Sequence, residues 1–265
     1  MIAWLAPGQG MERPGMGQDL AQTFGNPLFD LLEPGLHSTH RIQPALTAVA
    51  LGAAAVLAAE GVACDVVAGH SVGELAAWSI AGGASPVEAV QLAATRGQAM
   101  AAAAKASPGG MWAFDVEAVP DPLPEGLVAA VYNPAEVVLS GVGGRGRPIA
   151  TAGPWHSPSM AKAQGSFAAA LGRLPPRKLT IPMVSNHDGQ SHSDDATLRE
   201  HLVRQLTHPV RWNEVLATLR DLGVREVVVL GPGKILTSHL RRTPQFRVHR
   251  TDNAEALRAT VGSLR

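Results

Sequence analysis

The sequence predicts an α/β protein built on a largely parallel β-sheet with helices on both faces. Short apolar runs at 2–6, 66–68 and 225–230, the last two rich in β-branched residues, have the length of buried strands. Ala- and Leu-rich stretches of helical character separate these runs. Strands that alternate with helices in this way favour a parallel sheet. The segment 110–151 differs, with strand-like runs between Pro- and Gly-rich turns, and we expect it to form a small inserted lobe.

Along the first part of the chain, the strand at 2–6 runs into the loop Pro7-Gly8-Gln9-Gly10. Helices are expected at 16–24, from Gln43-Pro44 to about Gly61, at 73–80, and from Ser85-Pro86 to about Ser107. Proline is tolerated in a first turn, glycine commonly ends a helix, and Ser85 is a favourable N-cap.

The inserted lobe is expected to hold strands at 111–116, 128–132 and 137–140. Beyond it we expect a helix at 158–171, a strand at 181–184, helices at 195–206 and 211–222, a strand at 225–230, a last helix after Gly231-Pro232-Gly233-Lys234 and an edge strand at 246–250. Residues 1–109 and 152–265 are therefore expected to form one large unit, and residues 110–151 the small one.

The composition is that of a globular protein with a substantial core. Of 265 residues, 46% are apolar and 17% are charged, and Lys plus Arg equal Asp plus Glu at 22 each. Without an overall field, neither nucleic acid nor a membrane is an expected partner. The N-terminus lacks a basic segment, and the Ala-rich run 45–59 is too short to span a membrane. Since Cys64 is the single cysteine, no intramolecular disulfide is possible, and we expect a cytoplasmic protein.

The stretch 66–78 carries the clearest chemical signal. An apolar strand is followed by Gly69-His70-Ser71-Val72-Gly73 and then by a helical run, which is the context that makes G-x-S-x-G informative. The glycines permit a sharp turn that exposes Ser71, and the following helix points its free N–H groups at the same place. The alternative is a tight turn with an incidental serine. The context favours a nucleophile.

A serine at its ordinary pKa needs a base within hydrogen-bond reach. The sequence offers ten histidines for this role. Local context favours His156 in Pro154-Trp155-His156-Ser157-Pro158, because flanking prolines restrict the backbone at a turn into a helix. The residues alone leave the other histidines open as candidates.

Two nucleotide-type motifs are not expected to be functional. The run Gly141-Val142-Gly143-Gly144-Arg145-Gly146 matches G-x-G-x-x-G, but Arg147-Pro148 follows where a helix would be needed, so a flexible turn is expected. Gly233-Lys234 resembles the end of a phosphate-binding loop, but Val228 stands where its leading glycine belongs.

The histidine spacing predicts no metal site. The pairs His37 and His40, and His187 and His192, lack further carboxylate or cysteine partners at the usual ligand spacing. We therefore expect solvated or capping histidines at these positions.

Motifs in order along the chain resemble those of malonyl-CoA:acyl-carrier-protein transacylases and of the acyltransferase domains of polyketide and fatty-acid synthases. The resemblance runs from residue 3 to about residue 241, and it is carried by Pro7-Gly8-Gln9-Gly10, Gln43-Pro44-Ala45, Gly69-His70-Ser71-Val72-Gly73-Glu74, Thr95-Arg96-Gly97, Tyr132-Asn133-Pro134, His156-Ser157, Gln205-Leu206 and Gly231-Pro232-Gly233-Lys234. It implies an α/β-hydrolase-like large subdomain that carries a small ferredoxin-like one.

The resemblance also implies roles for single residues. Ser71 would be the nucleophile and His156 its general base, with the backbone carbonyl of Gln205 orienting the histidine in place of a triad carboxylate. The backbone N–H groups of Gln9 and Val72 would form the oxyanion hole.

Substrate binding is implied for a second group of residues. Arg96 would bind the malonyl carboxylate through its guanidinium fork, although spacing alone would favour an ordinary helix-surface arginine. His70 would line the pocket, and Gln43 and Asn133 are weaker candidates.

The activity implied is transfer of a malonyl group from CoA to the phosphopantetheine thiol of an acyl carrier protein through an acyl-serine ester. No metal, redox group or other cofactor is required, and the partners are malonyl-CoA and the carrier protein. Three alternatives stay open: transfer of a non-malonyl acyl group, an editing hydrolase that clears carrier-protein thioesters, and a non-catalytic carrier-docking subunit.

The sequence departs from the family pattern in the small lobe. Few residues separate Gly141 from His156, where the family usually has a helix and a further strand, so an incomplete ferredoxin-like lobe is expected. The segment 16–43 is also short, and Trp155 stands where a small side chain is common. Because carrier proteins are usually acidic, a basic patch is expected, at Arg145 and Arg147 or at Arg241 and Arg242.

Overall fold

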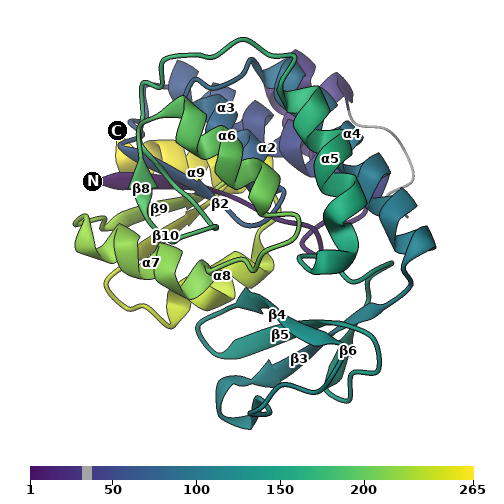
Figure 1. Ribbon diagram of the computed structural model, residues 1–265. Helices are drawn as coiled ribbons and strands as arrows, with labels where there is room; N and C mark the ends of the chain where they lie inside the picture. The colour runs from purple at the N-terminus through teal and green to yellow at the C-terminus, as the bar shows by residue number, and fades with distance from the viewer. Residues whose placement is uncertain (32–37) are drawn as a thin grey trace.

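The computed structural model describes residues 1–31 and 38–265 and shows an α/β protein (Figure 1). Its main sheet has six strands in the order β10-β9-β1-β2-β7-β8. Neighbouring strands are parallel except β7 and β8, which form an antiparallel edge hairpin. In this order the strands are Arg247–Arg250, Glu226–Val229, Ile2–Ala6, Val66–Gly69, Met183–Val184 and Ser191–His192. The largely parallel sheet predicted from the sequence is confirmed, while β8 was not predicted.

The three central strands are buried because helices cover both faces of the sheet. The side chains of Val66, Val67, Val227 and Val228 are fully buried, which explains continuous apolar runs without a polar alternation. Register pairs Ala6 of β1 with Gly69 of β2. The loops that follow these two strands therefore leave the sheet side by side.

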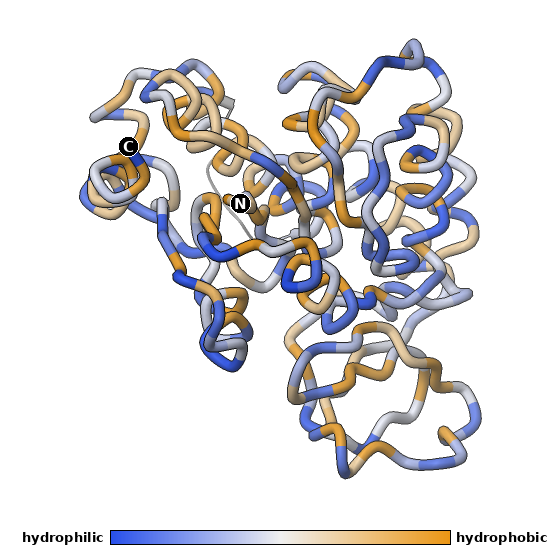
Figure 2. The backbone as a smooth tube through the Cα atoms, turned by 90° about the vertical axis from the view of Figure 1, so that its left-hand side faces the viewer, coloured by the Kyte–Doolittle hydropathy of each residue, from blue (hydrophilic) through white to orange (hydrophobic). Residues whose placement is uncertain are grey.

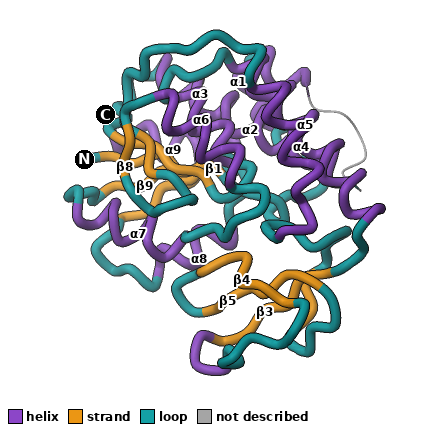
Figure 3. Tube along the Cα trace, in the orientation of Figure 1, coloured by secondary structure: helices purple, strands orange, loops and turns teal. Residues whose placement is uncertain are grey.

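Nine α-helices and three short 3-10 helices lie within the described residues (Figure 3). The α-helices are α1 (Gln18–Phe24), α2 (Thr39–Ala59), α3 (Gly73–Ile80), α4 (Pro86–Ala106), α5 (Ala161–Leu171), α6 (Asp195–Arg204), α7 (Trp212–Asp221), α8 (Lys234–Arg241) and α9 (Ala254–Leu264). The 3-10 helices are η1 (Pro27–Leu31), η2 (Val116–Ala118) and η3 (Pro158–Met160). The expected helices are present, and α4 begins with the predicted cap, since Ser85 and Glu88 form a reciprocal capping box.

Two predictions about helices were wrong. The sequence indicated α8 as the last helix, but α9 follows, capped by Asn253, whose side chain accepts a hydrogen bond from the Ala256 N–H at 2.8 Å. A helix was expected to open at Gln43-Pro44, but α2 opens at Thr39, which places Pro44 inside the helix. Pro44 leaves one carbonyl of the first turn without its helical donor, a local cost that burial of the rest of α2 offsets.

Helix α2 is long and apolar enough to cross a membrane by length and composition. It has 21 residues, and its most apolar window has a mean hydropathy of 1.8, so counting only 45–59 underestimated the length of the helix. In the fold, 78% of its most apolar window is buried, and it packs against α4 and α3. Helix α2 is a core helix of this fold.

A second, antiparallel sheet lies at one end of the molecule (Figures 1 and 2). Its four strands follow the order β4-β5-β3-β6. They are Leu127–Tyr132, Glu136–Gly141, Gly110–Asp115 and Arg147–Ile149. The first three were predicted and β6 was not, since a three-residue run containing Pro148 has little strand signal of its own.

The small sheet has its own apolar cluster and a backbone link to the main body. Leu127, Val137 and Leu139 form the buried part of that cluster. The Val210 N–H donates to the Ala130 carbonyl and the Tyr132 N–H donates to the Val210 carbonyl, both at 2.8 Å. These two hydrogen bonds attach the end of β4 to the segment before α7. The glycine-rich run 141–146 begins with the last residue of β5 and continues as the turn to β6, so the expected turn is confirmed.

Candidate active site

The turn between β2 and α3 holds Ser71 in a strained conformation at the end of a central strand. The φ angle of Ser71 is 52°, a left-handed value that residues other than glycine rarely adopt. A Cβ at position 69 would lie 2.1 Å from the Gly73 carbonyl carbon, and one at position 73 would lie 2.4 Å from the Ala6 carbonyl oxygen. Only glycine fits at either place. The turn therefore has the tight strand–turn–helix geometry that presents a nucleophile.

His156 reaches Ser71 from the other side of the site. The distance from His156 Nε2 to Ser71 Oγ is 2.8 Å, and His156 Nδ1 lies 2.8 Å from the Gln205 carbonyl oxygen. Because a carbonyl only accepts, Nδ1 carries the proton and Nε2 is free to accept from the serine hydroxyl. Burial lowers the pKa of His156 to about 4, and the positive charge of Arg96 also lowers it. Hydrogen bonds to the Gln205 and His208 backbone act in the opposite direction. The imidazole is therefore neutral at pH 7 and can act as a base.

Arg96 extends from α4 into the same site and is buried, with 2% of its surface exposed. Its Nη1 donates to Gln43 Oε1 at 2.9 Å, and its Nη2 donates to Gln205 Oε1 at 2.8 Å and approaches Ser71 Oγ at 3.4 Å. Among the described residues, no carboxylate oxygen lies within 4.0 Å of this guanidinium, so neutral amides hold its charge. A buried cation without an ion pair is costly, and an anionic ligand would compensate it.

A buried hydrogen-bond network behind the turn supports these groups, and the sequence did not reveal two of its members. Asn186 accepts from the Ser71 N–H at 2.8 Å and donates through Nδ2 to the Gly69 carbonyl at 2.7 Å. Glu74 accepts from the Asn186 N–H at 2.6 Å and from Gln205 Nε2. Burial raises the pKa of Glu74 to about 8, and the Asn186 hydrogen bond and Arg96 oppose this shift. The one available signal for Asn186 was its place just after a buried strand.

The loop after β1 packs directly against the nucleophile turn. A Cβ on Gly8 would lie 2.5 Å from the His70 carbonyl oxygen, so this approach requires glycine. Gln9 is fixed through its side chain, whose Oε1 accepts from Thr39 Oγ1 at 2.6 Å. Within the described part of the chain, the backbone N–H groups of Gln9 and Val72 have no hydrogen-bond acceptor. The two loops that meet at this turn therefore each carry a free backbone donor, which an oxyanion hole would require.

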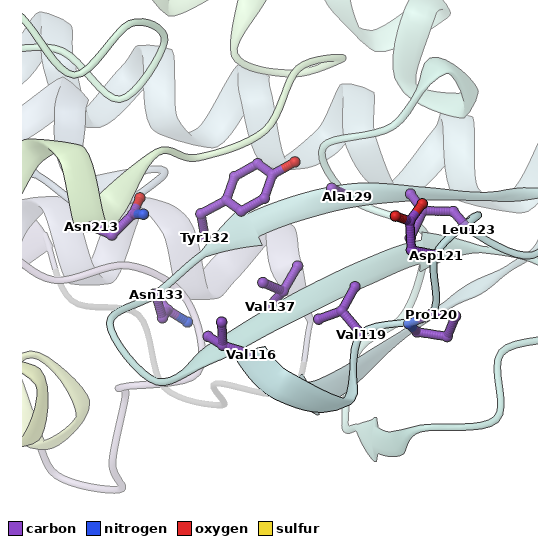
Figure 4. Close-up of a pocket in the computed structure, with 10 residues that line it drawn as sticks. All are labelled: Val116, Val119, Pro120, Asp121, Leu123, Ala129, Tyr132, Asn133, Val137 and Asn213. Carbon is purple, nitrogen blue, oxygen red and sulfur yellow. The ribbon is translucent and has the colours of Figure 1, made fainter.

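The weaker candidates occupy different positions. Gln43 contacts Arg96 directly, as described above. His70 packs edge-on against Trp212, with ring centroids 5.2 Å apart. Burial lowers the pKa of His70 to about 3. His239 and His156 lower this pKa as well, and a hydrogen bond with Asn133 raises it. Asn133, which follows β4, borders a cavity of about 420 Å³ on the small sheet beside Tyr132 (Figure 4). The structure therefore groups Gln43 with Arg96 and places Asn133 at the small-sheet border.

Of the other histidines discussed from the sequence, His37 lies outside the described residues. His40 is exposed at the start of α2. The remaining pair, His187 and His192, lies on the β7–β8 hairpin.

Three features define an acyl-transfer site on this α/β fold. They are a serine on a tight strand–turn–helix connection, a histidine oriented by a backbone carbonyl, and a buried arginine at the serine hydroxyl. Residues 20–262 match the acyl transferase domain family. Malonyl CoA-acyl carrier protein transacylases resemble this chain over 91% of its length and 93% of theirs, at 31% identity for Synechocystis and 36% for Mycobacterium tuberculosis. The chain therefore belongs to the malonyl-CoA:acyl-carrier-protein transacylase family.

Solved structures agree with this assignment. The crystal structure of the transacylase from Mycobacterium tuberculosis superposes with a TM-score of 0.91 at 33% identity, covering 98% of this chain and 99% of that one. A malonyl-transacylase solved with a type II polyketide synthase acyl-carrier protein gives a TM-score of 0.88 at 27% identity, covering 99% of each.

Proposed function

We propose that this protein transfers a malonyl group from CoA to the phosphopantetheine thiol of an acyl carrier protein through an acyl-serine intermediate. The observation that carries the proposal is the 3.4 Å approach of the buried Arg96 guanidinium to Ser71 Oγ. It puts a carboxylate-binding group beside the nucleophile, and a malonyl thioester has its free carboxylate close to its reacting carbonyl. The named activity of the transacylase relatives supports the same function.

In the first half-reaction, Ser71 Oγ attacks the thioester carbonyl and gives its proton to His156 Nε2. The oxyanion of the tetrahedral intermediate is held by the backbone N–H groups of Gln9 and Val72. The intermediate collapses as the C–S bond breaks, and CoA leaves with the proton from His156. A malonyl-serine ester remains. The Gln205 carbonyl stabilises the imidazolium while it exists.

The second half-reaction reverses the roles. The phosphopantetheine thiol gives its proton to His156 Nε2, and the thiolate attacks the ester carbonyl. The C–O bond to Ser71 breaks, and the serine oxygen regains the proton from His156. The cycle is therefore ping-pong, with one acyl-enzyme between two thioesters.

Every proton and charge in this cycle is handled by the chain itself, so we propose that no cofactor takes part. The acyl carrier protein, free or as a polyketide synthase domain, would be the second substrate of a trans-acting enzyme. A cytoplasmic location fits the single free cysteine, Cys64.

We further propose an α/β-hydrolase-like large subdomain, residues 1–109 and 152–265, and an incomplete ferredoxin-like small subdomain, residues 110–151. The order of the small sheet supports this division. Counting β3 to β6 as one to four, the order is 4-1-3-2 with antiparallel neighbours, as in a βαββαβ sheet. The two crossover helices are replaced by η2 with a Pro-rich loop and by the turn at 142–146.

Mass spectrometry of the acyl-enzyme tests the function. We expect malonyl-CoA to add one malonyl group to the wild type, acetyl-CoA to label it far less, and Ser71→Ala to stay unlabelled with either. Adding holo carrier protein should then move the label to the carrier faster than water releases it. Faster release to water would favour the editing hydrolase, and an unlabelled wild type would leave only a docking role.

A further inference from the structure

A group of histidine and aspartate side chains lies at the β7–β8 hairpin and at the end of α6. The Asp188 carboxylate lies between two imidazoles, with Oδ2 2.9 Å from His192 Nε2 and Oδ1 4.0 Å from His201 Nδ1. The rings of His192 and His201 are nearly perpendicular, at 88°, with centroids 5.0 Å apart. One ligand atom from each of the three residues falls within 4.8 Å of the other two.

We propose that Asp188, His192 and His201 bind one divalent transition-metal ion, with Zn²⁺ the ion that the donor set fits best. Zinc takes imidazole nitrogen and carboxylate oxygen in tetrahedral geometry at about 2.0–2.2 Å, which separates adjacent ligand atoms by roughly 3.3–3.5 Å. The Asp188 Oδ2–His192 Nε2 separation is 2.9 Å and the Asp188 Oδ1–His201 Nδ1 separation is 4.0 Å, so one histidine nitrogen lies nearer than that value to an oxygen of the carboxylate and the other lies farther from its second oxygen. Small side-chain rotations would therefore complete a three-residue site with a fourth position for water.

The surroundings of the cluster hold its members in place. Asp188 Oδ1 accepts from the Gln190 N–H at 3.0 Å, which fixes the carboxylate across the hairpin turn. The hydroxyl of Ser185, buried beneath the cluster, lies 3.1 Å from His201 Nδ1. The Gln190 hydrogen bond is of the kind that orients a ligating carboxylate in metal sites. The Ser185 contact involves the His201 nitrogen that would bind the ion, so the hydroxyl would give up this contact when the ion binds.

The site is also reachable from solvent. The exposed fractions of the Asp188, His192 and His201 side chains are 33%, 22% and 13%. Partial exposure allows an ion to enter the site, and partial burial restricts the motion of the ligand side chains. The histidine spacing predicted no site here, since the third ligand comes from the following helix, and this proposal replaces that expectation.

A bound ion would connect two segments that support the candidate active site. Asp188 and His192 belong to the hairpin that carries Asn186, which binds the Ser71 N–H. His201 lies one turn before Gln205, whose carbonyl holds His156. Coordination would fix these segments to each other, so we expect the ion to stabilise the fold without touching substrate.

Zinc titration of the EDTA-treated, full-length protein tests the proposal. Isothermal titration calorimetry with ZnCl₂ at pH 7.5 should give one Zn²⁺ per chain, and a hundredfold excess over Kd should raise Tm by about 5 °C. His192→Ala combined with His201→Ala should weaken binding by about 100-fold or more, and Asp188→Asn should weaken it less. His40→Ala, which removes an exposed histidine at the start of α2, should bind as the wild type does.

No saturable zinc binding by the wild type, or equal binding by the double variant, would overturn the proposal. Far-UV circular dichroism in EDTA checks that the variants fold. Cobalt substitution of the wild type gives a second readout that needs no variant. Intense visible bands of four-coordinate Co²⁺ are expected, whereas the weak spectrum of the hydrated ion would contradict a built site.

Discussion

The Ser71 turn and the small sheet differ in how tightly their residues are fixed. The turn is fixed by the left-handed backbone of Ser71, by two glycines in close contact with neighbouring backbone and by a buried hydrogen-bond network. Larger side chains at these glycines would clash with that backbone. In the segments that connect the strands of the small sheet, Val116 is 50% exposed and Val142 is 64% exposed, and within the sheet Leu127, Val137 and Leu139 form a minor core. The contrast places the chemistry in a rigid main body. The small sheet contributes Tyr132 and Asn133 to the border of a cavity.

The largest effect is expected from removing the nucleophile. Ser71→Ala should lower malonyl transfer on the order of 10⁴-fold or more, because no acyl-enzyme can form. Initial rates with holo carrier protein and radiolabelled malonyl-CoA measure the loss. Transfer within tenfold of the wild type would show that Ser71 does not carry the acyl group.

Filling the space at a turn glycine should cost less but still be severe. Gly69→Ala would force the Gly73 backbone away, and a displacement of about 1 Å at reacting groups can cost 10²-fold in rate. The matched control is Gly165→Ala on α5, where a Cβ meets nothing within 4 Å and alanine favours the helix. Activity assays and thermal unfolding of both variants provide the measurement. Equal activity in the two would contradict a rigid turn.

Local signals account for the parts of the fold that were predicted. The valine-rich runs of β2 and β9 and the Ser85–Glu88 capping box of α4 are signals contained within a few residues. These three elements could therefore be predicted from the sequence. The strands β6 and β8 are short and polar, and they exist because β3 and β7 offer partners. The N-cap Asn253 is also a local signal, and it is sufficient to predict the start of α9.

The site shows the same division between local and distant information. Ser71 is marked by its own glycines, and His156 only partly by its prolines. Arg96 and Gln205 meet 109 residues apart, so only resemblance to a family suggested their roles. Asn186 joins Ser71 across 115 residues and was missed.

A test of where the carrier docks compares the two regions directly. Arg241→Glu with Arg242→Glu should raise the KM for an acidic carrier about fivefold at low salt, because Arg241 lines a cavity that also reaches Gly10 in the loop after β1. The same reversal at Arg145 and Arg147 on the small sheet should have less effect, since Arg147 already pairs with Glu136 at 2.7 Å. A larger increase in KM for the Arg145 and Arg147 variant would instead indicate that the carrier docks on the small sheet.

The smallest effect is expected in the pH dependence of stability. The folded-state pKa of His156, about 4, lies below its ordinary value of 6.5, so the unfolded chain binds more protons between these values. This contribution to stability is present above pH 6.5 and is lost as the pH falls towards 4. The raised pKa of Glu74 has the opposite effect on stability as the pH falls. This effect is the same in the wild type and in a His156→Gln variant, so it cancels when the two are compared. His156→Gln should therefore lose less Tm than the wild type between pH 6.5 and 4.5, and parallel curves would contradict neutral burial.

The most direct test of the central claim is the ratio of kcat/KM for malonyl-CoA to that for acetyl-CoA in Arg96→Ala. If the buried guanidinium binds the malonyl carboxylate, malonyl turnover should fall about 100-fold while acetyl turnover stays level or rises. Arg177→Ala, which removes an arginine paired with Glu88 on the surface, should keep the wild-type ratio. Collapse of the ratio in Arg96→Ala alone is the predicted result, and an unchanged ratio would contradict the account.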